Sequence, residues 1–185
     1  EKLKEAAKVA DMIITTGGVS VGKKDIMHES LRLMGAERIF WRVKMKPGMP
    51  TLFSAYKKTS DITATDNCAS EREIPIISLS GNPFGVAVSI ELLIRPALEK
   101  MMQDPSIGLK EVNGIMADNF EKGIKGRRFI RAYLENGKFH LPNGLHSNGV
   151  LSSMAGCNCL IDTKTMENQE SRSLNAGDKV GAILL

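Results

Sequence analysis

The strongest constraint on the fold comes from residues 11–25, which read DMIITTGGVSVGKKD. Residues 12–16 are a short apolar, β-branched run, which is typical of a buried parallel strand. A glycine-rich loop follows at once, and apolar residues then recur at helical spacing up to Gly35, which predicts a helix C-terminus. Asp25 stands where it can cap that helix. A strand, a glycine loop and a helix in this order predict an α/β unit.

Two interpretations of the glycine loop are open. Residues 17–23 match the glycines and the lysine of a P-loop, but Lys24 stands where that motif needs Ser or Thr to hold magnesium. A strand–loop–helix unit can also bind phosphate through backbone N–H groups and the helix N-terminus, with Asp25 coordinating a hydrated magnesium ion. The alternative is a structural turn in which Asp25 serves only as a helix cap.

The rest of the first hundred residues continues the α/β pattern. Residues 57–73 are polar and lack periodicity, which indicates a hairpin tip or a mobile loop. Helices are predicted at residues 2–10 and 84–102, the second kinked at Pro96, and strands at residues 38–45, 51–56 and 74–80.

After about residue 103 the pattern changes to short strands separated by turns. Asn136-Gly137 is a hairpin signal inside the second of these strand regions. We therefore predict an α/β domain at residues 1–103 and an all-β domain at residues 109–185. The strand patterns fall at residues 112–120, 127–141, 158–163 and 178–185.

Composition bears on three possible partners of the chain: nucleic acid, a membrane and a zinc ion. The net charge is +4 and the basic residues are scattered, so we expect no nucleic-acid partner. No run approaches the roughly 20 apolar residues that span a bilayer, so we expect a cytoplasmic protein without a membrane partner. Cys157 and Cys159 lie near His140 and His146, which on paper could make a zinc site. Without a paired C-x-x-C, buried reduced thiols are the favoured interpretation.

Two further segments carry polar groups to the same predicted edge. Arg42, Lys44 and Lys46 alternate with apolar residues and would project from one strand face. Gly81-Asn82-Pro83 ends a buried strand and opens a helix. Ligands of open α/β sheets bind beyond the carboxyl ends of the strands, so we expect both segments to lie beside the glycine loop.

Together these segments resemble the molybdopterin molybdenumtransferase family, which includes bacterial MoeA and the E domain of gephyrin. The resemblance rests on TTGGVSVGKKD, FWRVKMKPGMP and SLSGNPFGVAVSIELLIRPAL, which occur in the family's order. RRFIRAYL, SNGVLSSMAGCNCLI and LNAGDKVGAILL are similar to the family's C-terminal β-barrel domain. The resemblance implies the second half of a three-layer MogA-like α/β domain, followed by a small β-barrel.

The resemblance also implies an activity and a set of roles. The family's enzyme takes adenylylated molybdopterin and molybdate, hydrolyses the adenylyl bond with a divalent metal such as Mg²⁺, and yields molybdenum cofactor and AMP. Asp25 would hold the metal, and Arg42 and Lys46 would stabilise negative charge and attract molybdate. The expected ligand-binding residues are Gly17, Gly18, Ser20, Gly22, Lys44, Gly81, Asn82, Pro83, Ser147, Ser152 and Ser153.

Four positions depart from the family pattern. Met49 stands in place of a lysine and Gly85 in place of a serine, and in the family both positions lie at the molybdate pocket. Ser80 replaces a proline, and Arg42 replaces a lysine. Loss of the lysine removes a cation and a donor, so weaker or altered molybdate binding is expected. The family's first half-domain and two N-terminal domains have no counterpart here, so we expect a fragment that is inactive alone and a homodimer in the full-length protein.

Three functions remain in competition. The first is molybdenum insertion. The second is a paralogue that binds pterin or nucleotide without inserting metal, which Met49 and Gly85 motivate. The third is a protein scaffold, as in the gephyrin branch.

Overall fold

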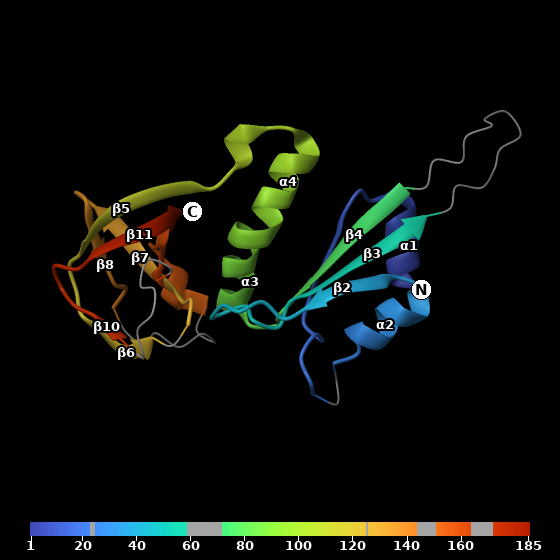
Figure 1. Ribbon diagram of the computed structural model, residues 1–185, viewed down its shortest axis with the longest axis horizontal. Coiled ribbons are helices and arrows are strands. Elements are labelled where there is room, and N and C mark those ends of the chain that lie inside the picture. Colours follow the sequence, from blue (N-terminus) through green and yellow to red (C-terminus); the bar gives the residue numbers. More distant parts are fainter. Residues whose placement is uncertain (23–24, 59–71, 125, 144–150, 164–171) are drawn as a thin grey trace, which may run out of the picture. The chain divides into compact units, whose positions relative to one another are not determined.

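The computed structural model describes residues 1–22, 25–58, 72–124, 126–143, 151–163 and 172–185. These residues form two compact units. The first unit consists of Glu1–Val43 and Pro50–Gly81, and the second of Lys44–Met49 and Asn82–Leu185. Figure 1 follows the chain from the blue N-terminal elements to the red C-terminal strand. No helix of the described residues is long and apolar enough to cross a membrane.

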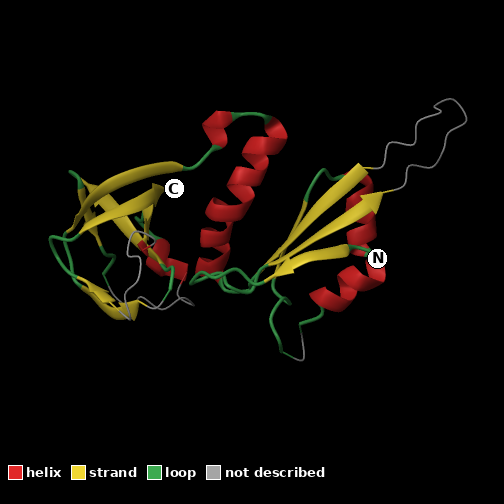
Figure 2. Ribbon diagram, viewed as in Figure 1, coloured by secondary structure: helices red, strands yellow, loops and turns green. Residues whose placement is uncertain are grey.

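The first unit is a four-stranded sheet with helices on one face (Figure 2). The strand order is β1-β4-β3-β2, and β1 runs parallel to β4. Residues from both helices and three strands make the core, including Ala7, Leu31 and Ile76. The elements are α1 (Lys2–Val9), β1 (Ile13–Thr16), α2 (Met27–Met34), β2 (Glu37–Trp41), β3 (Leu52–Lys58) and β4 (Arg72–Leu79).

The start of α2 corrects one sequence prediction. Gly35 ends the helix with φ 91°, as predicted, because glycine adopts the left-handed conformation without steric cost. Asp25 does not cap the helix, however, because the N-cap position belongs to Ile26 and no side chain caps it. The Asp25 carboxylate instead accepts a hydrogen bond from the backbone N–H of Gly22.

The predicted strand over residues 38–45 is wrong in its second half. Strand β2 ends at Trp41, because Arg42 has φ 73° and cannot continue the pleated backbone. Lys44 and Lys46 then fold with the second unit, whereas Arg42 belongs to the first. The three cations therefore do not lie on one strand face.

Strands β3 and β4 support the hairpin alternative for residues 57–73, and they extend into that range at Lys57, Lys58, Arg72 and Glu73. They pair antiparallel from Leu52 opposite Ser78 to Lys58 opposite Arg72. The rest of the segment predicted as a hairpin tip or a mobile loop, residues 59–71, lies outside the described part of the chain.

The second unit begins with a long helical segment. It runs through α3 (Pro83–Ser89), a π-helical turn η1 (Ile90–Ile94) and α4 (Arg95–Met102). Asn82 caps α3 by accepting the N–H of Gly85 at 3.0 Å, and proline follows at the first helical position. The helix is irregular near the predicted kink at Pro96, because the π-helical turn ends at Ile94, two residues before the proline.

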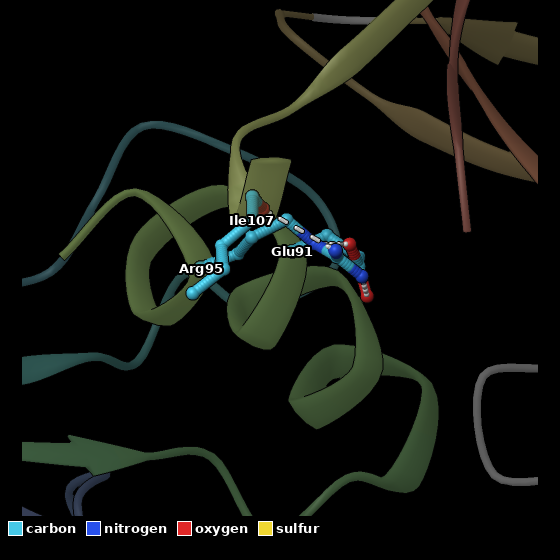
Figure 3. A network of polar contacts seen from close by, with 3 residues as sticks. All are labelled: Glu91, Arg95 and Ile107. Atoms are coloured by element: carbon cyan, nitrogen blue, oxygen red, sulfur yellow. Dashed lines mark hydrogen bonds and ion pairs between the residues drawn. The ribbon is translucent and has the colours of Figure 1, made fainter. Parts of the chain in front are cut away.

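An ion pair ties this turn to the segment that follows the helix. Arg95 donates from Nε to Glu91 Oε2 at 2.5 Å and from a terminal nitrogen to the carbonyl oxygen of Ile107 at 3.4 Å (Figure 3). Ile107 belongs to the short 3-10 helix Pro105–Ile107, where the chain leaves the helical segment. The hydrogen bond to the Glu91 carboxylate raises the pKa of Arg95, so the guanidinium stays protonated.

A closed five-stranded barrel completes the second unit, in the order β11-β5-β8-β7-β9. Asn136 and Gly137 form the predicted hairpin turn, with φ 49° and 77°. The α/β unit followed by a small β-barrel is the predicted fold class. Two strands were not predicted as such: β6 (Phe120–Ile124), whose first residue was included in the strand region 112–120, and β10 (Arg172–Leu174). These two strands pair with each other. The barrel strands are β5 (Lys110–Met116), β7 (Phe129–Glu135), β8 (Lys138–His140), β9 (Cys159–Asp162) and β11 (Lys179–Leu184).

Candidate functional site

The glycine loop leaves the carboxyl end of β1 and returns to the start of α2. Gly17 and Gly18 have φ 83° and 70°, which only glycine adopts readily. The Cα of Gly81, at the carboxyl end of β4, lies 4.0 Å from the place that a Cβ on Gly17 would occupy. The first unit therefore brings two of the predicted segments together at the expected edge of the sheet.

The amides of the loop are not equivalent. The N–H of Gly17 donates to the carbonyl oxygen of Leu79 at 2.9 Å, and that of Gly22 donates to Asp25 Oδ2 at 2.5 Å. The amides of Gly18 and Ser20 donate to no described residue. Of the predicted phosphate donors, the Gly18 amide and Ser20 are therefore the best placed to receive a ligand.

Trp41 connects this loop to Arg42. Its indole Nε1–H donates to the carbonyl oxygen of Val19 at 2.9 Å, and the Arg42 Cζ lies 4.2 Å from the centroid of its ring. The His28 ring meets the indole edge-on, with centroids 4.8 Å apart and an interplanar angle of 86°. Sequence reasoning missed Trp41 and His28, because it took Trp41 only as one of the apolar residues that alternate with charged residues in the predicted strand. The available signal was the one tryptophan of the chain standing directly before a cation.

The segment 44–49 is built into the second unit. The Lys46 N–H donates to the carbonyl oxygen of Arg127 at 3.0 Å, and the Phe129 N–H donates to the carbonyl oxygen of Lys46 at 2.8 Å. The Lys46–Pro47 peptide bond is cis. These bonds fix the backbone of Lys46 against the start of β7, while its side chain is exposed.

Gly48 lies in a tightly packed place. A Cβ there would come within 2.8 Å of Ser89 Oγ and of Met45 Cε, and 3.3 Å from the carbonyl oxygen of Gly85. The turn therefore packs directly on α3, near the position where the sequence departs from the family at Gly85. Met49, the other departure, is 41% exposed.

The second unit also holds the serine positions and the C-x-C pair. Ser152 and Ser153 lie in the short 3-10 helix Leu151–Met154, and Ser147 lies outside the described residues. Burial raises the pKa of Cys159 to about 12 and also raises that of Cys157, against the opposing influence of Arg131. Neither protonated thiol is a ready zinc ligand. The described residues contain no group of three or more side chains suited to a metal ion.

The predicted residues thus fall into two sets. The first unit holds Gly17, Gly18, Ser20, Gly22, Asp25, Arg42 and Gly81, and the second holds Lys44, Lys46, Asn82, Pro83, Ser152 and Ser153. That the two sets share one pocket stays a prediction.

Comparison with known proteins gives matches along the chain. Residues 1–100 match the family model described as "Probable molybdopterin binding domain", and residues 113–185 match "MoeA C-terminal region (domain IV)". A protein named molybdopterin molybdenumtransferase from Staphylococcus aureus is 30% identical over 185 residues, which cover 98% of this chain and 40% of that protein. A protein of the same name from Bacillus subtilis is 29% identical over 162 residues, which cover 86% of this chain and 34% of that protein.

Solved structures support the same fold. The molybdopterin biosynthesis MoeA protein from Pyrococcus horikoshii aligns with a TM-score of 0.69 at 17% identity, covering 98% of this chain and 39% of that one. A molybdenum cofactor biosynthesis protein from Pyrococcus furiosus aligns with a TM-score of 0.66 at 18% identity, covering 99% and 52%. This chain therefore spans about 40% of the length of the Staphylococcus aureus relative that it matches.

Proposed function

Because the chain belongs to the MoeA family, we propose that it is part of a molybdopterin molybdenumtransferase and acts in molybdenum cofactor biosynthesis. The proposed reaction hydrolyses the adenylyl bond of adenylylated molybdopterin, releases AMP and leaves molybdate bound to the pterin. The observation that carries the proposal is the glycine loop at the carboxyl end of β1, next to Gly81. A strand–loop–helix unit of this kind binds phosphate groups.

Different residues of the chain bind different groups of the ligand in this proposal. The Gly18 amide and Ser20 bind a phosphate group, and the absence of a side chain at Gly17 and Gly81 allows the ligand to approach the backbone. The exposed Arg42 guanidinium donates to phosphate oxygens and stabilises the charge that develops as the adenylyl bond breaks. Lys46, in the second unit, supplies a further cation for the anionic substrate or for molybdate.

A magnesium ion fits the residues present. Mg²⁺ is usually bound by one or two carboxylates together with substrate phosphates and water, so the single Asp25 carboxylate is sufficient. One of its oxygens accepts the Gly22 N–H, which fixes the carboxylate beside the loop, and a carboxylate has lone pairs left for an ion. The ion would polarise the phosphoanhydride. Gly22 therefore acts by orienting Asp25.

The proposal places the full-length protein in the cytoplasm as a homodimer. Its partner is a small anionic substrate, and neither nucleic acid nor a membrane takes part. The family resemblance and the scattered charges of the sequence support this proposal.

The test is molybdate-dependent release of AMP by the full-length protein. The protein is supplied with adenylylated molybdopterin and Mg²⁺, with and without molybdate, and AMP is measured by chromatography. We expect AMP release to require molybdate and to fall at least about 100-fold in an Asp25→Ala variant. Glu29→Ala, an exposed carboxylate on α2, is the control that should leave the rate unchanged. AMP release indifferent to molybdate contradicts the proposal.

The exposed thioether of Met49 favours a second candidate, a family member that binds pterin or nucleotide without inserting the metal. A methionine there supplies neither a charge nor a donor to an oxyanion. Calorimetry separates the two functions: retained ligand affinity without turnover supports the binding protein. Molybdate turnover that appears only in a Met49→Lys variant supports the same conclusion.

A further inference from the structure

Trp41 contacts both parts of the proposed phosphate site in the first unit. We propose that Trp41 is a positioning residue that holds the glycine loop and Arg42 in one fixed arrangement, so that both engage the same phosphate group of a nucleotide. The inference rests on the proposed function, because it concerns the same site. The contacts that carry it involve Val19, His28, Trp41 and Arg42, here named the Trp41 cluster.

The first step is the peptide between Val19 and Ser20. The indole N–H holds the Val19 carbonyl oxygen at 2.9 Å. A peptide unit is planar, and its N–H points opposite to its C=O. Fixing the Val19 oxygen toward Trp41 therefore fixes the Ser20 N–H away from Trp41. The Ser20 amide donates to no described residue, so this contact orients a predicted donor to the ligand.

The second step is the placement of Arg42. Its Cζ lies 4.2 Å from the centroid of the Trp41 ring, a cation–π distance. Its backbone is held by a hydrogen bond from its N–H to the Thr51 carbonyl oxygen at 2.8 Å, with φ 73°. A non-glycine residue in this region costs free energy, and such residues cluster at functional sites. Contact with the ring leaves the N–H edges of the guanidinium available to an anion.

The third step is the support on the other side of the indole. His28, on α2, meets the ring edge-on at 4.8 Å. Its Nε2 is buried and has no hydrogen-bond partner among the described residues, so its contribution here is packing against the ring. The indole is thus held by Val19, His28 and Arg42 together, and motion of the ring would move both the loop and the guanidinium.

The experiment is a double-mutant cycle on the full-length protein, with AMP as the probe and calorimetry as the measurement. Trp41→Phe keeps an aromatic face for Arg42 but loses the N–H, so we expect a rise in Kd of about 3- to 10-fold. Trp41→Leu loses both contacts, and a larger rise is expected. In an Arg42→Ala background, Trp41→Leu should have a clearly smaller effect, because part of its action passes through Arg42.

The control variant is Phe40→Leu. Phe40 is the preceding aromatic residue of β2, is 41% exposed and contacts Phe53 instead of the loop. We expect this variant to bind AMP as the unmodified protein does. Thermal unfolding of each variant checks that the fold is retained, and Trp41→Phe is the variant that preserves the packing best.

Three outcomes overturn the inference. Unchanged AMP affinity in Trp41→Phe and Trp41→Leu shows that the residue is only structural, while the proposed function stands. Additive effects of Trp41→Leu and Arg42→Ala show that the two residues act independently. Failure of the unmodified protein to bind AMP removes the phosphate site itself, and with it the proposed function.

Discussion

The glycine loop, described at residues 17–22 and 25, and the turn at residues 44–49 are both proposed to face an anionic ligand, yet they are held in different ways. Two bonds of the loop join residues close together in the chain, because Gly22 donates to Asp25 and Met27 donates to the Gly18 carbonyl oxygen. Gly17 also donates to Leu79 at the end of β4, and Val19 is buried in the core. Trp41 adds one side-chain contact from the next strand. The turn is fixed by backbone bonds of Lys46 to Arg127 and Phe129, far along the chain.

This difference between the loop and the turn predicts that substitutions in one act mainly on ligand binding and substitutions in the other mainly on stability. Gly18 is half-buried and Ser20, Val21 and Gly22 are exposed, so substitutions at these loop positions leave the core in place and should act mainly on the ligand. A turn packed against a helix and a barrel strand is part of the interior of the second unit, so substitutions there should act mainly on folding. Four substitutions or measurements test this contrast.

Gly48→Ala should have the largest effect on stability. The new Cβ would lie 2.8 Å from Ser89 Oγ and 3.3 Å from the Gly85 carbonyl oxygen, at φ 94°. Backbone strain and overpacking together should lower the free energy of unfolding of the second unit by about 3 kcal/mol, measured by chemical denaturation.

Gly177→Ala is the matched control for that substitution. Gly177 has φ 93°, but a Cβ there meets nothing within 4 Å. It should therefore show the backbone cost alone, about 1 kcal/mol. Equal losses in the two variants would show that the turn is not tightly packed, and the contrast between turn and loop would lose its basis.

Gly18→Ala comes next. Gly18 has φ 70°, and a Cβ there would lie 3.2 Å from the Cγ of Met27, a flexible side chain that can move aside. We expect a loss of about 1 to 2 kcal/mol in the free energy of unfolding, with a larger proportional loss of AMP affinity. Gly126→Ala has a similar φ of 72° and open space around it, and it should leave AMP affinity intact. A loss of stability in Gly18→Ala as large as that in Gly48→Ala would contradict the expectation that substitutions in the loop act mainly on ligand binding.

The same contrast explains how much of the molecule could be predicted from the sequence. Local signals were sufficient for several elements: β-branched runs for β1 and β4, Gly35 at the end of α2, and Asn136-Gly137 for a hairpin of the barrel in the second unit. The glycine loop was also recognisable, because its glycines are required by backbone conformation. These features depend on residues close together in the chain.

Features set by distant residues could not be predicted in the same way. Alternation of apolar and charged residues suggested a strand through Met45, but the chain leaves the sheet after Trp41 because Lys46 pairs with residues of the barrel. The pairing of β6 with β10 likewise joins two short segments that carry little signal alone. The contact of Trp41 with Val19 depends on how a strand and a loop meet in space.

Asp25→Asn should have a small effect on folding and a large one on metal use. The amide oxygen can still accept the Gly22 N–H, so the free energy of unfolding should change by about 0.5 kcal/mol or less. Loss of the negative charge should raise the Mg²⁺ concentration needed for half-maximal AMP release by at least about 10-fold. An unchanged magnesium requirement would remove Asp25 from the metal site while leaving the loop structure as described.

Alkylation of Cys157 and Cys159 probes the barrel, whose interior is enclosed by residues far apart in the chain. This experiment measures access to the thiols and needs no substitution. Cys159 is fully buried with its pKa raised to about 12, so at pH 8 it stays a protonated thiol and iodoacetamide should not modify it until the protein unfolds. Cys157 is only half-buried, so it should react slowly under the same conditions. Peptide mapping by mass spectrometry identifies each site. Rapid labelling of Cys159 in the folded protein would show that the barrel opens locally. Packing between residues far apart in the chain would then protect the barrel from opening no better than the loop is protected.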